Sequence, residues 1–298
     1  MPYRTAEKAA MTLYRELRES GAEETRELVK VERSGGRAIV TLNDPERLNP
    51  LSVGLNLQLQ ERLSELAADP ALRAIVLTGA DPAFSAGGDL KMMAAGNRTI
   101  RDSSAPSDTS DAWRWIRRQF GGVARLIVNT DKLFVAALNG PAAGVGLAWA
   151  FACDIVIASQ RAVLVSAFGR LGLVPEVGTS WLLTRRLGYQ GAVASYLRGG
   201  QITATDALEL GLVQEVHPHE ELLAAAGKWC ARAERLPSHA FEMTKPLLRS
   251  ASDAAWEESL RLEEFAEANC FSTAALGDAA RSLLEGNGVG ERDRAGRQ

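Results

Sequence analysis

The sequence has few cysteines, no apolar segment among its first twenty residues and no long apolar run, and each shortage argues against a class of protein. Its three cysteines, Cys153, Cys230 and Cys270, are widely spaced and form no CxxC pair, so neither a disulfide framework nor a metal site is predicted. No apolar run is long enough to cross a bilayer, and the first twenty residues lack the apolar core of a signal peptide. We therefore expect a cytoplasmic protein without a membrane partner.

Neither sign of charge is in large excess. Lys and Arg total 34 against 37 Asp and Glu, which gives a formal net charge of -3. Because proteins that bind nucleic acids carry concentrated basic charge, no nucleic-acid partner is expected. Hydrophobic residues make up 46% of the 298 residues, enough for one substantial core with an appendage.

Strand and helix patterns alternate through most of the chain and then give way to helices. Such alternation predicts an α/β fold with mostly parallel strands, and only helical periodicity follows Val216. Polar residues dominate 98–110, which we expect to be poorly ordered. The expected parts are an N-terminal helical extension (1–22), an α/β core (23–216), a C-terminal helical region (217–286) and a disordered tail (287–298). The core patterns are a hairpin (27–42), helix (52–69), strand (73–79), loop and helix (97–129), strand (133–138), helix (144–151) and strand (154–159).

Glu176 is the leading candidate for a catalytic residue. It is the only ionisable side chain in the segment LGLVPEVGTSWLL (171–183). Apolar surroundings disfavour the charged form of a carboxyl group and can tune it for proton transfer near neutral pH. The alternative is a turn glutamate that points into water, which is the commoner situation for this residue type.

Two glycine-rich turns follow predicted strands. AFSAGGD (83–89) places two glycines before Asp89, and NGPAAGVG (139–146) runs into a predicted helix. Exposed amides in such turns, and at a helix N-terminus, can bind an oxyanion or phosphate. Neither turn matches a GxGxxG or P-loop pattern. The alternatives are a simple turn with Asp89 as helix cap, and close packing of a helix on a strand.

These three segments, in this order and spacing, resemble the enoyl-CoA hydratase/isomerase (crotonase) superfamily, most closely its Δ3,Δ2-enoyl-CoA isomerases. The resemblance covers residues 25–270 and implies a crotonase-like spiral of ββα units with a C-terminal helical oligomerisation region. It also implies an acyl-CoA substrate, whose thioester oxygen is held by the amides of Gly88 and Val145. Coenzyme A is then part of the substrate and no other cofactor is expected.

The resemblance further assigns binding positions and an assembly. It implies that Arg47, Ala86, Leu90 and Lys91 contact CoA, although solvated surface charges are the alternative for Arg47 and Lys91. An acyl pocket is expected at Ala148, Trp149 and Phe168, while aromatic residues, here also Trp115, Phe120 and Trp181, more often fill a core. The family's C-terminal helices imply a homotrimer or hexamer.

Departures from the family pattern point to the reaction. The two glutamates that hydratases use fall on Ala148 and Phe168, and neither side chain can transfer a proton. A single acid at Glu176 is the pattern of members that shift a double bond. Dehalogenases of the superfamily need a histidine base, but this chain has no histidine before His217; we expect cap or surface roles for His217, His219 and His239. The open alternatives are hydratase, hydrolase or decarboxylase chemistry, or a non-catalytic acyl-CoA-binding protein.

Overall fold

The structure is a computed structural model that describes residues 18–19, 21–102, 107–199 and 201–284. Most of the expected N-terminal extension and all of the expected tail lie outside these residues. The chain divides into two compact units, Met1–Ala233 and Glu234–Gln298, and each is described by itself.

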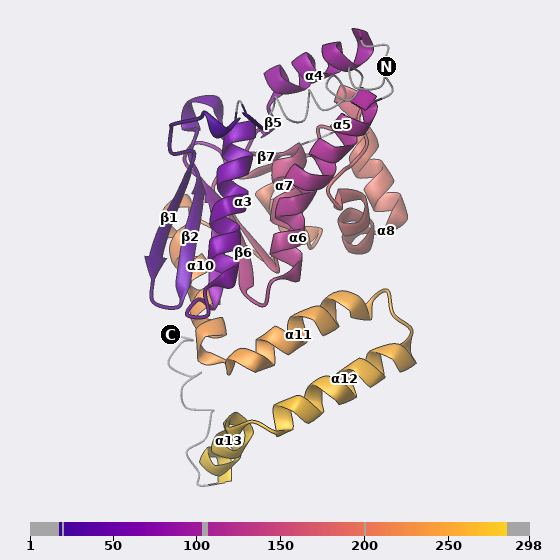
Figure 1. The fold of residues 1–298 in the computed structure, drawn as a ribbon. Helices are drawn as coiled ribbons and strands as arrows, with labels where there is room; N and C mark the ends of the chain where they lie inside the picture. The colour runs from indigo at the N-terminus through magenta and orange to yellow at the C-terminus, as the bar shows by residue number, and fades with distance from the viewer. Residues whose placement is uncertain (1–17, 20, 103–106, 200, 285–298) are drawn as a thin grey trace, which may run out of the picture. The chain divides into compact units, whose positions relative to one another are not determined.

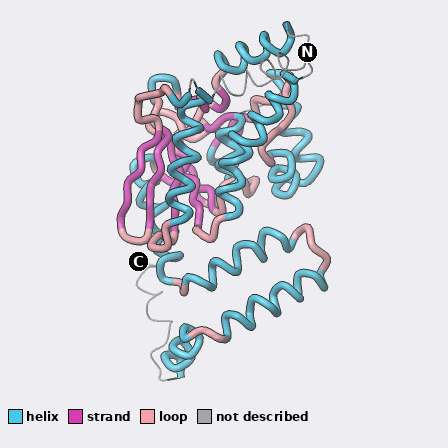
Figure 2. The backbone as a smooth tube through the Cα atoms, in the orientation of Figure 1, coloured by secondary structure: helices cyan, strands magenta, loops and turns pink. Residues whose placement is uncertain are grey.

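A six-stranded sheet forms the centre of the first unit, as Figures 1 and 2 show. Its first two strands form the predicted hairpin, which turns at Gly35 with a φ of 59°. All the other neighbours in this sheet pair in parallel, which confirms the expected α/β fold. In sheet order the strands are β1 (Val29–Ser34), β2 (Arg37–Leu42), β4 (Ala74–Gly79), β6 (Leu133–Leu138), β8 (Ile155–Ser159) and β11 (Glu215–His217).

Helix α3 (Val53–Ala68) contacts β1 and β2 of this sheet, and α6 (Gly121–Asn129) packs against α3 (Figure 1). The Oγ atom of Ser52 caps α3 by accepting a hydrogen bond from the Leu55 amide at 3.3 Å. The leucines that predicted this helix from the sequence are wholly or almost wholly buried in the core. The hydrophobic periodicity therefore indicated both the element and its buried face.

Two small sheets lie apart from the long strands and carry the segments of interest. The first is ordered β10 (Gln201–Thr203), β9 (Val163–Val165), β7 (Ala142–Ala143), and the second pairs β3 (Pro50–Leu51) with β5 (Gly87–Gly88). Strand β9 runs parallel to β7 and antiparallel to β10, while β3 and β5 are parallel. Both glycine-rich turns therefore contribute a strand to this small-sheet layer.

The polar region between β5 and β6 is more helical than its composition indicated. Residues 98–102 continue α4 (Leu90–Asp102), and residues 107–110 open α5 (Ser107–Trp115). Residues 103–106 lie outside the described residues, and poor order over 98–110 stays a prediction. A π-helical turn, η2 (Ile116–Phe120), then leads into α6.

The remaining helices of the first unit are α7 (Gly144–Ala152), α8 (Thr179–Arg198), α9 (Ala204–Glu209) and the start of α10 (Leu222–Arg235). Helix α10 buries Leu222, Ala226 and Cys230. The first unit extends to Ala233, whereas the sequence patterns place the end of the core at Val216.

The second unit is entirely helical in its described part. It contains α11 (Ser238–Ala251), α12 (Trp256–Phe271) and α13 (Ala274–Leu284), with α11 and α12 in contact. Several large apolar side chains here are exposed, among them Trp256 at 76% and Phe265 at 72%. The expected oligomerisation region stays a prediction.

Candidate active site

The two glycine-rich turns lie directly against each other. Ser85 and Ala142 form a parallel bridge, and the Ala143 amide donates to the Ser85 carbonyl oxygen at 2.9 Å. Gly87 has a φ of 84°, and a Cβ atom there would lie 2.7 Å from the Ala143 oxygen. Only glycine fits such an approach, so main-chain contacts join the two turns.

Both predicted oxyanion donors sit in these joined turns. Gly88 ends β5, and Val145 occupies the first turn of α7, with Ala143 as its N-cap residue. The first four amides of an α-helix have no intrahelical acceptor and lie at the positive end of the helix dipole. The Val145 amide is one of these. That both amides point at one thioester oxygen stays a prediction.

Glu176 lies half-buried in the loop between η3 (Gly169–Leu171) and α8. Burial raises the pKa of its carboxyl group from 4.5 to about 7. Burial is the sole cause, since no hydrogen bond or charge from the described residues acts on this carboxyl. Such a group exchanges a proton readily at neutral pH, unlike the water-exposed turn glutamate of the alternative interpretation.

The backbone after Glu176 holds two left-handed residues in succession. Val177 has a φ of 57° and Gly178 a φ of 83°, and the Thr179 amide donates to the Glu176 carbonyl oxygen at 3.0 Å. A β-branched residue is rarely left-handed, and such strain persists only where surrounding contacts hold it. Val177 packs against the hydrophobic core. This left-handed conformation sets the direction of the loop at Glu176. The sequence carries no signal for it.

Parallel pairing brings the segment before Glu176 close to the second glycine-rich turn. Because β7 and β9 are parallel, with Ala143 opposite Val165, both chains leave the sheet at the same edge. Strand β7 continues into Gly144, and β9 continues toward Phe168. The Arg186 side chain of α8 also stacks 5.3 Å from the ring centre of Phe151 in α7. The helix that follows Glu176 is thus attached to the helix that carries Val145.

The residues predicted for the acyl pocket are buried. Ala148 and Trp149 have no exposed surface, and Phe168 is 3% exposed. The Trp149 Nε1 atom donates to the Phe120 carbonyl oxygen at 3.0 Å, and the two rings meet edge to face. Trp115 packs on Phe120 in the same way, so these aromatic rings fill the core. Contact of Ala148, Trp149 or Phe168 with an acyl chain stays a prediction.

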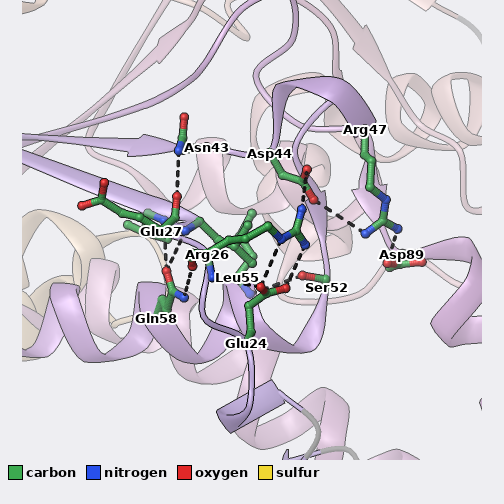
Figure 3. Close-up of polar contacts among 12 residues, drawn as sticks. Glu24, Arg26, Glu27, Asn43, Asp44, Arg47, Ser52, Leu55, Gln58 and Asp89 are labelled. Atoms are coloured by element: carbon green, nitrogen blue, oxygen red, sulfur yellow. Dashed lines mark hydrogen bonds and ion pairs between the residues drawn. The ribbon is translucent and has the colours of Figure 1, made fainter.

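Three of the predicted CoA positions are exposed beside the first turn, namely Ala86, Leu90 and Lys91. The fourth, Arg47, is not a freely solvated charge. It forms ion pairs with Asp89 and, at 3.6 Å, with Asp44 (Figure 3). A CoA phosphate at Arg47 would compete with these carboxylates, and contact of all four residues with CoA stays a prediction.

Asp89 caps α4, as the simpler interpretation of the Gly-Gly-Asp turn expected. Its Oδ1 atom accepts hydrogen bonds from the amides of Lys91 at 2.9 Å and Met92 at 3.3 Å. Burial acts most strongly on this carboxyl and raises its pKa, but the Arg47 side chain and the two amides outweigh it, so the net pKa is lower than usual. The cap and ion pair hold Asp89 charged, directly after Gly88.

His219 joins the two strand ends from which the turns depart, a role that the sequence did not indicate. Its Nε2 atom lies 3.0 Å from Asp81, and its Nδ1 atom lies 3.1 Å from the Asn139 carbonyl oxygen. The Asn139 side chain also donates to Asp81 at 2.9 Å. With both ring nitrogens engaged, His219 is a structural link between the turns.

The described residues contain no group of three or more side chains placed to hold a metal ion. In the same part of the chain, no helix combines the length and apolar character needed to span a bilayer.

The comparisons with known proteins agree with this geometry. Residues 32–285 match the model of the enoyl-CoA hydratase/isomerase family. The chain is 34% identical to the 1,2-epoxyphenylacetyl-CoA isomerase of Escherichia coli, over 76% of this chain and 84% of the relative. It is 33% identical to a putative enoyl-CoA hydratase of Thermus thermophilus, over 87% and 98%. A solved monofunctional enoyl CoA isomerase from M. smegmatis superposes with a TM-score of 0.65, at 31% identity over 78% and 98% of the two chains. The family model covers more than half of the chain, and the fold joins both glycine-rich turns. This protein therefore belongs to the enoyl-CoA hydratase/isomerase (crotonase) family of acyl-CoA enzymes.

Proposed function

We propose that the protein shifts a double bond in an acyl-CoA thioester from Δ3 to Δ2, with Glu176 as its single acid–base group. One observation carries the proposal. Glu176 has a pKa raised to about 7, while Ala148 and Phe168 stand where the resemblance places the two hydratase acids. One carboxyl group suffices to move a proton between two carbons, whereas the usual hydration route needs two.

The reaction conserves every atom. The Glu176 carboxylate takes a proton from C2 of a 3-enoyl-CoA, and the C–H electrons form a C2–C1 double bond as the thioester carbonyl becomes an oxyanion. The amides of Gly88 and Val145 stabilise this dienolate, each worth about 3 to 4 kcal/mol by analogy with measured oxyanion donors. The carbonyl then re-forms, the double bond settles between C2 and C3, and C4 takes the proton from Glu176.

The pKa of Glu176 suits both halves of this cycle. A carboxylate of pKa about 7 is a stronger base than an ordinary glutamate yet is still ionised in about half of the molecules at pH 7. Its protonated form is then a weak enough acid to keep the proton while the dienolate exists and to transfer it to C4. Two of the similar proteins are named isomerases, so isomerisation of a CoA thioester lies within the range of reactions named for similar proteins.

The same proposal covers substrate and assembly. The substrate is an acyl-CoA, and coenzyme A is the only cofactor-like group required. Exposed apolar side chains on α12, such as Phe265, support assembly into a trimer or hexamer.

The test is incubation with 3-enoyl-CoA thioesters of several chain shapes, with double-bond position followed by NMR and mass spectrometry. We expect conversion to 2-enoyl-CoA by the wild type, and a rate lower by about 10²- to 10⁴-fold in Glu176→Gln.

Glu61→Gln, which alters an exposed glutamate of α3, is the matched control and should keep the wild-type rate. Full activity of Glu176→Gln would refute the mechanism. A wild type that binds every thioester unchanged would favour a non-catalytic protein, and addition of water to 2-enoyl-CoA would favour a hydratase.

A further inference from the structure

The segment just before β3 makes a turn of unusual conformation. Leu48 and Asn49 both have positive φ, 64° and 53°. Asparagine tolerates the left-handed region better than most residues, and leucine does not. Asn49 is wholly buried, although asparagine is usually exposed. A buried side-chain amide is costly unless its donor and acceptor atoms form hydrogen bonds within the protein.

The Asn49 side chain finds those partners in the loop that leads to Gly88. Its Nδ2 atom donates to the carbonyl oxygens of Ala80 at 2.8 Å and Ala83 at 2.7 Å. Its Oδ1 atom accepts from the Asp44 amide at 2.8 Å. One side chain therefore ties the turn at Asp44 to the chain that leaves β4, more than thirty positions away in the sequence.

The main chain of the same turn holds the next residues of that loop. The Ser85 hydroxyl donates to the Asn49 carbonyl oxygen at 2.8 Å and accepts from the Gly87 amide at 3.1 Å. The Leu48 carbonyl oxygen accepts from the Ala86 amide at 2.8 Å. Strand β3 then pairs with β5, where Leu51 lies opposite Gly88. Contacts from this one turn thus continue, residue after residue, up to the proposed oxyanion donor.

We propose that Asn49 is a positioning residue for the oxyanion site. Its side chain holds the loop at Ala80 and Ala83, its main-chain carbonyl holds the Ser85 hydroxyl, and together these contacts fix the direction of the Gly88 amide. This inference rests on the function proposed above. An oxyanion donor contributes only when it is held in place before the reaction, and a displacement of about 1 Å far from the chemistry can cost a hundredfold in rate. Asn49 touches no reacting atom, so its effect reaches the substrate only through the loop.

The test measures polarisation of a bound thioester carbonyl. Hexanoyl-CoA labelled with ¹³C at the carbonyl has no double bond to move, so infrared difference spectroscopy reports the oxyanion site without turnover. Asn49→Asp removes the hydrogen bonds that Nδ2 donates to the carbonyl oxygens of Ala80, Ala83 and Phe84, and Ser85→Ala removes the hydroxyl bridge to the Asn49 carbonyl oxygen. Asn43→Asp is the matched control, because Asn43 lies in the same connection but donates to Glu27, away from the loop.

We expect a downshifted carbonyl stretch in the wild type and in Asn43→Asp, and loss of most of that downshift in Asn49→Asp and Ser85→Ala. Turnover of 3-enoyl-CoA should fall in parallel, with kcat lower by about ten- to a hundredfold and KM nearly unchanged. If Asn49→Asp does not fold, Ser85→Ala decides by the same readout. A full downshift in a folded Asn49→Asp, or in Ser85→Ala where it decides, overturns the positioning role and leaves the proposed function intact. Absence of the downshift in the wild type overturns the oxyanion site itself.

Discussion

Replacement of Glu176 by glutamine should make the protein more stable above neutral pH while lowering its activity. In the folded protein Glu176 keeps its proton up to about pH 7, whereas in the unfolded chain it loses it near 4.5. Between these values the folded state binds more protons, so the free energy of unfolding falls as pH rises from 4.5 to about 7 and is constant above that.

The size of this effect follows from the same two pKa values. Each pH unit between them corresponds to about 1.36 kcal/mol, so the change from 4.5 to about 7 sets an upper bound of about 3 kcal/mol. Because Glu176 is only half-buried, water screens part of its charge, and we expect about 2 kcal/mol. Glutamine has a similar shape and no charge, so Glu176→Gln should recover this amount at alkaline pH.

The assay is chemical denaturation of wild type and Glu176→Gln at about pH 5 and about pH 8.5. The difference in the free energy of unfolding between the two proteins should be larger at the higher pH by about 2 kcal/mol. Glu61→Gln again controls for loss of one negative charge. Equal pH dependence of Glu176→Gln and wild type would mean that Glu176 ionises as in water, and the argument from burial would fail.

Two further predictions follow from the site. The kcat/KM of the wild type should rise tenfold per pH unit to a plateau above about pH 7, because the base must be ionised; a plateau that extends down to about pH 5 would contradict this role. Gly87→Ala should lower kcat and destabilise the fold by about 1 to 3 kcal/mol, since its Cβ meets the Ala143 oxygen and its φ is positive. Gly35→Ala is the control, because Gly35 also has a positive φ but its Cβ would meet no atom within 4 Å. Comparing the kinetics and denaturation of the two variants separates the effect of backbone strain from that of the steric clash with Ala143.

The regular elements of the core could be predicted from the sequence because their signals are local. Strands β4 and β6 are continuous apolar runs, and α3 shows its leucine periodicity and its Ser52 cap. The start of α4 at Leu90 could not be predicted, because polar composition alone does not distinguish an exposed helix from a loop.

The site could be predicted only in part. Glu176 and the glycine-rich turns carry local signals, since a lone acid among apolar residues and paired glycines are visible in the sequence. The contacts of Asn49 join positions more than thirty residues apart, and those of His219 reach back to Asp81. Such pairings depend on the tertiary arrangement, as does the left-handed Val177, so no local pattern indicates them.

The way the two glycine-rich turns are joined has a consequence for how this scaffold can diversify. Backbone groups of Ser85 and Ala143 make the junction, and backbone amides supply the proposed donors. Most single substitutions elsewhere leave a peptide group unaltered, so the proposed oxyanion donors are tolerant of sequence drift. New reactivity can then arise by exchanging side chains at a few positions, such as 148, 168 and 176, without rebuilding the backbone that carries the proposed donors.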